Sequence, residues 1–157
     1  MSANEKKINR YERIYEQLEN LTAPVDNPVS RMATIVAVLH HKQALFFWTG
    51  FYLLNDSGQL QVGPYQGPLA CLELKKDTGV CWAGIRQEKT MVVSDVEKFP
   101  GHIACDSRSR SEIVVPLFDD KSKLIGVLDV DSDKYDSFDE TDSQWLSRIV
   151  SLVYQKQ

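Results

Sequence analysis

Apolar residues near the start of the chain recur every three or four positions, a spacing that places them on one face of a helix. They are Ile8, Tyr11, Ile14, Tyr15, Leu18 and Leu21. Pro24 and Pro28 end this helix, and a second helix is predicted after Pro28. Its inward-facing positions are Val29, Met32, Ile35, Val36 and Leu39. The pattern predicts two helices within residues 5–42.

The pattern becomes that of β-structure from residue 46 onward. Residues 46–54 are rich in aromatic and apolar side chains, and residues 60–66 return after a polar turn. A second pair of strands, residues 113–118 and 123–131, also flanks a polar turn. These segments predict two hairpins. Residues 67–105 are irregular and contain several Gly and Pro residues, which indicates loops and short helix.

The end of the chain again shows helical spacing. Asp139 is placed to cap a helix whose apolar positions follow it. These positions are Trp145, Leu146, Ile149, Val150 and Val153. The pattern therefore predicts an α+β fold, in which a central, mostly antiparallel sheet is flanked by N- and C-terminal helices. We expect a single domain over residues 1–157, with the sheet and its loops at 46–133 and the last helix at 139–156.

Length and charge narrow the possible functions. A chain of 157 residues corresponds to one ordinary domain. Its net charge of -4, with scattered Lys and Arg, disfavours a nucleic-acid partner. The longest apolar run, around residues 33–39, is far too short to cross a bilayer, so we expect no membrane association. A cytoplasmic location with reduced cysteines is therefore predicted.

Three cysteines lie in the irregular segment. They are Cys71, Cys81 and Cys105. The polar, loop-like surroundings of Cys105 favour an accessible, ionisable thiol, although free cysteines are usually buried and inert. A zinc site with His102 as the fourth ligand is the rival interpretation. The cysteines lack the tight CxxC spacing of structural zinc sites, so we predict no metal.

Acidic side chains form a second candidate group. Alternation along the last strand places Asp129 and Asp131 on one face, following Ile125 and Val127. Glu112, just before the preceding strand, could join them. If the three acids converge, repulsion and burial would raise at least one pKa and provide a general acid, while an ionised acid could hold an ammonium group. The alternative is that they are solvated residues at a strand end.

Two aromatic residues could complete a pocket. Trp48 and Tyr52 are four positions apart in the first strand and face the same way. They could enclose a small apolar methyl group, although core packing explains them about as well.

These residues occur in blocks that resemble the free methionine-(R)-sulfoxide reductases, which are GAF-domain enzymes. The blocks are WTGFYLL at 48–54, GPYQG at 63–67 followed by Ala70-Cys71, GVC at 79–81, GHIACD at 101–106, SEIVVPL at 111–117 and IGVLDVDS at 125–132. The resemblance implies a GAF-type fold and reduction of free L-methionine (R)-sulfoxide to L-methionine. It also implies a homodimer and no cofactor beyond an external thiol reductant, thioredoxin or a similar dithiol protein.

The same resemblance implies roles for single residues. Cys105 would be the nucleophile that becomes a sulfenic acid, and Cys71 would resolve it as a disulfide. Cys81 is similar to a third cysteine of the family that can pass the oxidation outward. The substrate-binding residues would be Trp48, Tyr52, Glu112, Asp129 and Asp131.

Two departures from the family pattern bear on the interpretation. Trp82 follows the GVC block where the family usually has glycine, and we expect its bulk to restrict the site. Residues 75–78 also lack the usual glycine and proline. The alternative function is a GAF module that senses a small ligand or redox state without turnover, and a zinc-binding regulatory domain is a weaker third possibility.

Overall fold

The N-terminal helices begin where the sequence caps them. The computed structural model describes residues 1–102 and 105–156. Helix α1 (Ala3–Thr22) starts after Ser2, whose hydroxyl accepts a hydrogen bond from the Glu5 amide while the Glu5 side chain accepts one from the Ser2 amide. Helix α2 (Pro28–Lys42) starts after Asn27, which caps two amides, and places Pro28 in its first turn. The two predicted helices are therefore confirmed.

Two apolar residues of these helices do not face inward as predicted. Leu21 is 49% exposed and Val29 is 60% exposed. Both lie in terminal turns beside the connection between α1 and α2, where no other element covers them. The apolar spacing therefore continues in the sequence beyond the region in which the helices pack.

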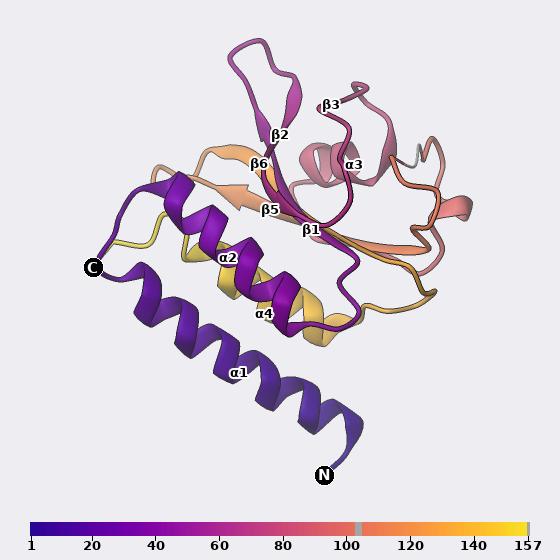
Figure 1. Cartoon of the computed structure of the whole chain (residues 1–157). Coiled ribbons are helices and arrows are strands. Elements are labelled where there is room, and N and C mark those ends of the chain that lie inside the picture. Colours follow the sequence, from indigo (N-terminus) through magenta and orange to yellow (C-terminus); the bar gives the residue numbers. More distant parts are fainter. Residues whose placement is uncertain (103–104, 157) are drawn as a thin grey trace.

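One antiparallel sheet of six strands forms the centre of the molecule (Figure 1). The strands are β1 (Trp48–Leu54), β2 (Leu60–Gln66), β3 (Glu73–Leu74), β4 (Met91–Val93), β5 (Ser111–Phe118) and β6 (Leu124–Ser132). Their order across the sheet is β3-β2-β1-β6-β5-β4. Both predicted hairpins, β1–β2 and β5–β6, are confirmed, and the pairing of β1 with β6 joins them at the centre.

The last helix, α4 (Glu140–Ser151), is capped by Asp139 as predicted, but it ends before the predicted residue 156. The buried Arg31 guanidinium explains the early end, because it donates hydrogen bonds to the carbonyl oxygens of Leu152 (2.9 Å) and Gln155 (2.6 Å). A guanidinium needs several acceptors when it is buried, and these carbonyls provide them outside the helix.

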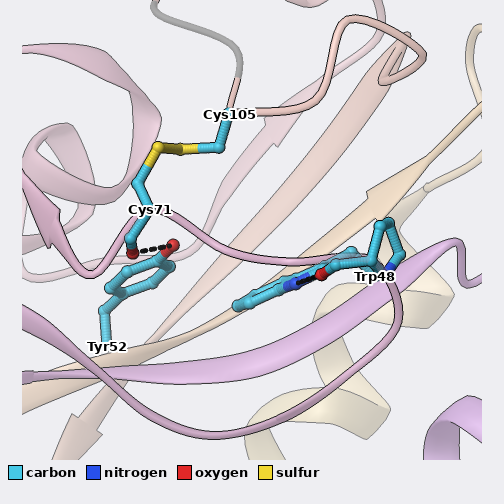
Figure 2. The surroundings of a disulfide bond; sticks show 5 residues. Trp48, Tyr52, Cys71 and Cys105 are labelled. Carbon is cyan, nitrogen blue, oxygen red and sulfur yellow. Dashed lines mark hydrogen bonds between the residues drawn. A yellow bond between two sulfur atoms is a disulfide. The ribbon is translucent and has the colours of Figure 1, made fainter.

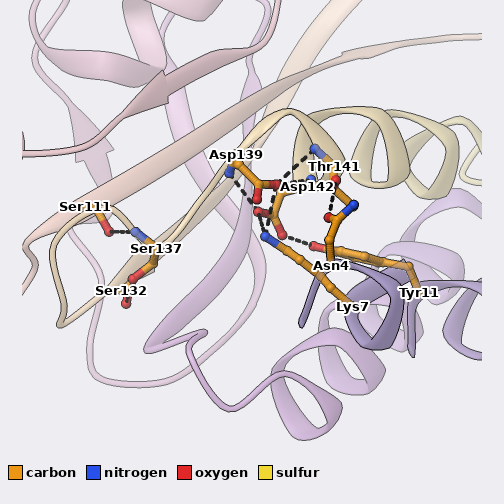
Figure 3. Close-up of polar contacts among 9 residues, drawn as sticks. All are labelled: Asn4, Lys7, Tyr11, Ser111, Ser132, Ser137, Asp139, Thr141 and Asp142. Atoms are coloured by element: carbon orange, nitrogen blue, oxygen red, sulfur yellow. Dashed lines mark hydrogen bonds and ion pairs between the residues drawn. The ribbon is translucent and has the colours of Figure 1, made fainter. Parts of the chain in front are cut away.

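Helices α1, α2 and α4 cover one face of the sheet, with α1 packed on α2 and α4 (Figure 1). Polar contacts join α1 to the start of α4: Lys7 pairs with Asp139 and Asp142, and the Tyr11 hydroxyl donates to Asp142 at 2.6 Å (Figure 3). Tyr11 is completely buried, so its hydroxyl requires such a partner. This link holds the outermost helix in place.

The opposite face carries α3 (Gly79–Gln87), the short 3₁₀ helix η1 (Val96–Lys98) and the loops around them. Loops and short helices are thus confirmed for the described residues of 67–105, but strands β3 and β4 also lie in this segment and were not predicted. Among the described helices, none is both long and apolar enough to span a bilayer.

Strand β6 separates the two faces by alternation, with one interruption. Leu128 and Val130 pack in the core under the helices, while Val127 packs on the side of α3. Ile125 was predicted to share the face of Val127, but it packs against the helix-side core. A bulge is the reason, because Gly126 pairs with Leu117 whereas the next pair joins Leu124 to Phe118.

Candidate active site

Three acidic side chains occupy neighbouring positions on the sheet face that lies away from α1, α2 and α4. Glu112 of β5 pairs with Asp131 of β6, and Asp131 pairs on its other side with Trp48 of β1. Asp129 lies one alternation earlier on β6, opposite Gly50. Glu112 and Asp129 are each only 5% exposed. The predicted convergence of the three acids is therefore present in the structure.

Stacked aromatic rings form a wall beside the acids. The centroid of the Trp48 ring lies 5.6 Å from that of Tyr52 and 5.4 Å from that of Tyr65. Gly50 makes room for this stack, because a Cβ there would lie 2.4 Å from both the Trp48 ring and the Tyr65 Cβ. The sequence interpretation missed Tyr65. The hairpin register next to the turn would have placed Pro64 opposite Gly50, but a register shift between Gly50 and Tyr52 places Tyr65 there.

A disulfide between Cys71 and Cys105 lies above the aromatic rings (Figure 2). It joins two loop residues that are 34 positions apart, and Cys105 is exposed. The Tyr52 hydroxyl donates to the carbonyl oxygen of Cys71 (3.2 Å), and the Trp48 indole donates to that of Pro68 (3.0 Å). The aromatic wall therefore also holds the backbone of the segment that carries Cys71.

The disulfide, the aromatic rings and the acids surround one cavity of about 210 Å³. Every residue that the sequence indicated for the site contributes to its lining: Trp48, Tyr52, Cys71, Cys81, Cys105, Glu112, Asp129 and Asp131. The cavity also reaches His102, whose Nε2 is buried and has no hydrogen-bond partner among the described residues. Burial lowers the pKa of His102, which favours its neutral form.

Burial raises the pKa of all three acids. The pKa of Glu112 lies well above its ordinary value, first because of burial and then because Asp129 and Asp131 are close. Burial and nearby Asp129 have the same effect on Asp131. Burial also raises the pKa of Asp129, while its neighbours Glu112 and Cys81 act to lower it. The cluster therefore keeps protons near neutral pH.

Cys81 lies in a different environment from the other two cysteines. It is in the first turn of α3, 5% exposed, and it is a free thiol. Burial raises its pKa well above the ordinary value, and Asp129 and Glu112 raise it further. Cys81 therefore lies in a helix that packs on the sheet, and its role in passing the oxidation outward stays a prediction.

The zinc set considered from the sequence is not assembled. Two of its cysteines form the disulfide, while Cys81 faces the acids. A different group could in principle hold a cation, since ligand atoms of Cys81, Glu112 and Asp129 lie within 4.8 Å of one another. All three groups are buried with raised pKa values, so they would have to lose protons first. The absence of a metal remains a prediction.

Trp82 does not restrict the cavity as expected. Its side chain is 4% exposed and packs in the cluster that includes Val80 and Val96. Its indole donates to the carbonyl oxygen of Leu74 at 3.3 Å, and it does not line the cavity. Cys81 lines the cavity, and Trp82 points away from it because adjacent side chains on a helix do not share a face.

The turn after Cys105 is fixed by an ion pair that the sequence interpretation missed. Arg108 donates from Nε and Nη2 to Asp106 at 2.9 and 2.6 Å, and its guanidinium lies 4.7 Å from the centroid of Phe47. Hydrogen bonds from Arg108 lower the pKa of Asp106 to about 2. The sequence signal for this ion pair is an acid followed two positions later by an arginine in a predicted loop. Ile103 and Ala104 of the GHIACD block lie outside the described residues.

Comparison with known proteins identifies the family. A GAF domain family model matches residues 32–155. GAF domain-containing protein A of Dictyostelium discoideum is 48% identical over 94% of this chain and 92% of the relative. Free methionine-R-sulfoxide reductase of Escherichia coli is 37% identical over 94% of this chain and 88% of the relative. The chain belongs to the free methionine-R-sulfoxide reductase family.

A solved structure of the same family supports this assignment. The X-ray structure of free methionine-R-sulfoxide reductase from Neisseria meningitidis, in complex with its substrate, matches with a TM-score of 0.88 at 42% identity. The match covers 94% of this chain and 87% of that chain. The resemblance seen in the sequence blocks and the GAF-type α+β fold are therefore confirmed. The roles of individual site residues remain predictions.

Proposed function

We propose that this chain reduces free methionine (R)-sulfoxide to methionine with two of its cysteine thiols. The observation that carries the proposal is the Cys71–Cys105 disulfide at a cavity whose other walls are buried acids and stacked aromatic rings. A disulfide in that position is the oxidised product expected of such a reaction. The names of the Escherichia coli and Neisseria meningitidis relatives agree with this substrate.

The reaction balances with these two thiols alone. The Cys105 thiolate attacks the sulfoxide sulfur, and the oxygen, with a proton, is transferred to the cysteine sulfur. The transient bond between the two sulfurs and the sulfur–oxygen bond of the substrate break, so that Cys105 becomes a sulfenic acid and methionine is released. The Cys71 thiolate then attacks the sulfenic sulfur, and the hydroxyl group leaves as water with one proton. Methionine sulfoxide gains two electrons and the two thiols lose them. No further cofactor is expected for this half of the cycle.

We assign different protonation states to the acids of the cluster. Glu112 is the proposed proton donor to the sulfoxide oxygen, because its pKa is raised well above the ordinary value. Asp129 is the proposed anion that holds the substrate ammonium group, because its neighbours Glu112 and Cys81 act to lower its pKa.

The aromatic wall gives a place for the apolar part of the substrate. Stacked rings of Trp48 and Tyr52 present an apolar surface next to the acids. A thioether methyl group packs favourably against such rings. This arrangement supports a site for one free amino acid, which is small enough for a cavity of about 210 Å³.

The oxidised enzyme must then be reduced by an external dithiol, and we propose a thioredoxin-type protein. The exposure of Cys105 supports attack by a partner thiolate on this disulfide. The partner becomes a disulfide while Cys71 and Cys105 return to thiols. A homodimer and a cytoplasmic location also remain proposals, consistent with a reduced thiol enzyme.

The direct test supplies the R and S epimers of free methionine sulfoxide separately, with a dithiol reductant, and measures methionine release. We expect turnover of the R epimer only, and a loss of at least about 10³-fold in Cys105→Ser because the nucleophile is removed. Cys71→Ser is the matched control, since without reductant it should release one methionine per enzyme and then stop at the sulfenic acid. Release of methionine by Cys105→Ser would overturn the mechanism.

Thiol counting without reductant separates this enzyme from the sensing module that the sequence left open. The reductase loses two thiols for each methionine formed. A sensor would bind the sulfoxide and lose none.

A further inference from the structure

Cys81 is the one cysteine that the proposed reaction does not use, and its position suggests a different role. Helix α3 places its thiol at the bottom of the cavity, where Sγ and carboxylate oxygens of Glu112 and Asp129 lie within 4.8 Å of one another. The side chain is 5% exposed and belongs to the apolar cluster on this face of the sheet. It lies among the acids and not at the surface.

This position is unsuitable for a thiol that passes oxidation outward. An exchange thiol must ionise and must reach both its own disulfide and the external reductant. The buried Cys81 thiol is surrounded by acids that disfavour its ionised form. By contrast, Cys105 is exposed and already paired with Cys71. The reductant can reach that disulfide directly.

Asp129 needs a hydrogen-bond donor at the place where the Cys81 thiol lies. Its Oδ1 is buried and lacks a hydrogen-bond donor among the described residues. A buried carboxylate oxygen without a donor costs free energy, about 1–3 kcal/mol or more for a charged group. The Cys81 thiol is a near donor, and its S–H can rotate toward the carboxylate.

We propose that Cys81 is a positioning residue for the acid cluster: its thiol donates a hydrogen bond to Asp129 and keeps this acid, not its neighbours, ionised. The consequence for substrate binding rests on the proposed function, but the hydrogen bond itself does not. In turnover, Cys81 thereby maintains the anion for the substrate ammonium group while Glu112 and Asp131 retain protons.

The groups around Asp129 show why one donor has a large influence. The titratable groups that face it are Glu112 from β5, Asp131 from its own strand β6, Cys81 from α3 and Tyr52 from β1. Among them, Glu112 and Cys81 lower the pKa of Asp129, against the larger effect of burial. Removing the thiol therefore raises the pKa of Asp129.

The hydrogen bond can be observed without activity. In the oxidised protein Cys81 carries the single remaining S–H among three cysteines, so the infrared S–H stretching band belongs to it alone. We expect this band below the frequency of a free thiol, shifting upward in Asp129→Ala and, in the native protein, upon acidification. A band at the free-thiol frequency that does not respond to pH would overturn the proposal.

Kinetics distinguish positioning from an exchange role. We expect Cys81→Ser, whose hydroxyl also donates, to keep the pH profile of kcat/KM. In Cys81→Ala the acidic limb should move upward by about one pH unit, which is about tenfold lower kcat/KM below the limb. If both variants release methionine normally in a single turnover but fail with the dithiol protein, Cys81 exchanges thiols and the proposal is wrong.

The same variants test whether Cys81 has only a structural role. In that case Cys81→Ala would have a lower melting temperature but an unchanged pH profile of kcat/KM, and this result would also reject the proposal. If the native protein does not reduce the sulfoxide, the proposed function fails, but the infrared measurement still decides whether Cys81 donates to Asp129.

Discussion

The two faces of the sheet are built from the same strands but contain different chemistry. On the helix side, Phe51, Leu128 and Val130 are completely buried among apolar residues. On the other side, alternate positions of the same strands carry Trp48 and Asp129. Burial of apolar side chains on the first face stabilises the fold, whereas the second face buries acids that repel one another when ionised. The difference shows that strand alternation confines the acids to one face, although both faces contain an apolar cluster.

The largest predicted effect is a loss of activity when an acid on the second face is replaced. Glu112→Gln keeps the shape of the side chain but removes the proton donor, so we predict about 10²- to 10⁴-fold lower kcat/KM for the R-sulfoxide. The free energy of unfolding should stay unchanged or rise at neutral pH, because one buried ionisable group is gone. Steady-state kinetics and urea denaturation measure the two quantities, and a large loss of stability would contradict the division of the faces.

The opposite pattern is expected on the helix side. Leu128→Ala should lower the free energy of unfolding by about 2–5 kcal/mol, since it leaves a cavity in a fully packed core. At a temperature where the variant remains folded, its kcat/KM should change by less than about threefold. Loss of activity without loss of stability would show that the helix side takes part in the chemistry.

A smaller effect is predicted for the pH dependence of stability. Glu112 and Asp131 have pKa values raised by folding, so the folded protein binds more protons than the unfolded chain. Their contribution to stability is complete below the ordinary carboxyl pKa range and is lost as the pH rises through the raised values. Urea denaturation of the native protein should therefore show stability falling over this interval.

Glu112→Gln combined with Asp131→Asn is the control for this prediction. The double variant should lose that part of the decline, because neither amide titrates. An unchanged pH dependence would mean that the two acids are ionised in the folded protein over the whole interval.

Local patterns predicted most of the fold. The helix cap at Asp139 and the polar turns of both hairpins act through neighbouring residues, and these predictions are confirmed. Alternation also placed Asp129 and Asp131 together correctly. The errors came from distant contacts: the early end of α4 depends on Arg31, more than a hundred residues away in sequence.

In the candidate site, too, local features were predictable from the sequence and distant contacts were not. Its residue types and blocks were visible in the sequence, and the pairing of Cys71 with Cys105 was implied by family resemblance rather than by spacing. The burial of Cys81 among the acids could not be predicted, because it depends on how α3 packs on β5 and β6. The bulge that turns Ile125 to the helix side had no local signal either.

Gly50 has a consequence for the dimensions of the binding site. A hydrogen atom occupies the place where any other residue would have a carbon 2.4 Å from the Trp48 ring. The indole therefore lies flat against the strand, and the depth of the cavity depends on a side chain that is absent. A single methyl group at position 50 would displace the ring of Trp48 or the side chain of Tyr65, so the size of acceptable ligands also depends on a residue beneath the aromatic wall.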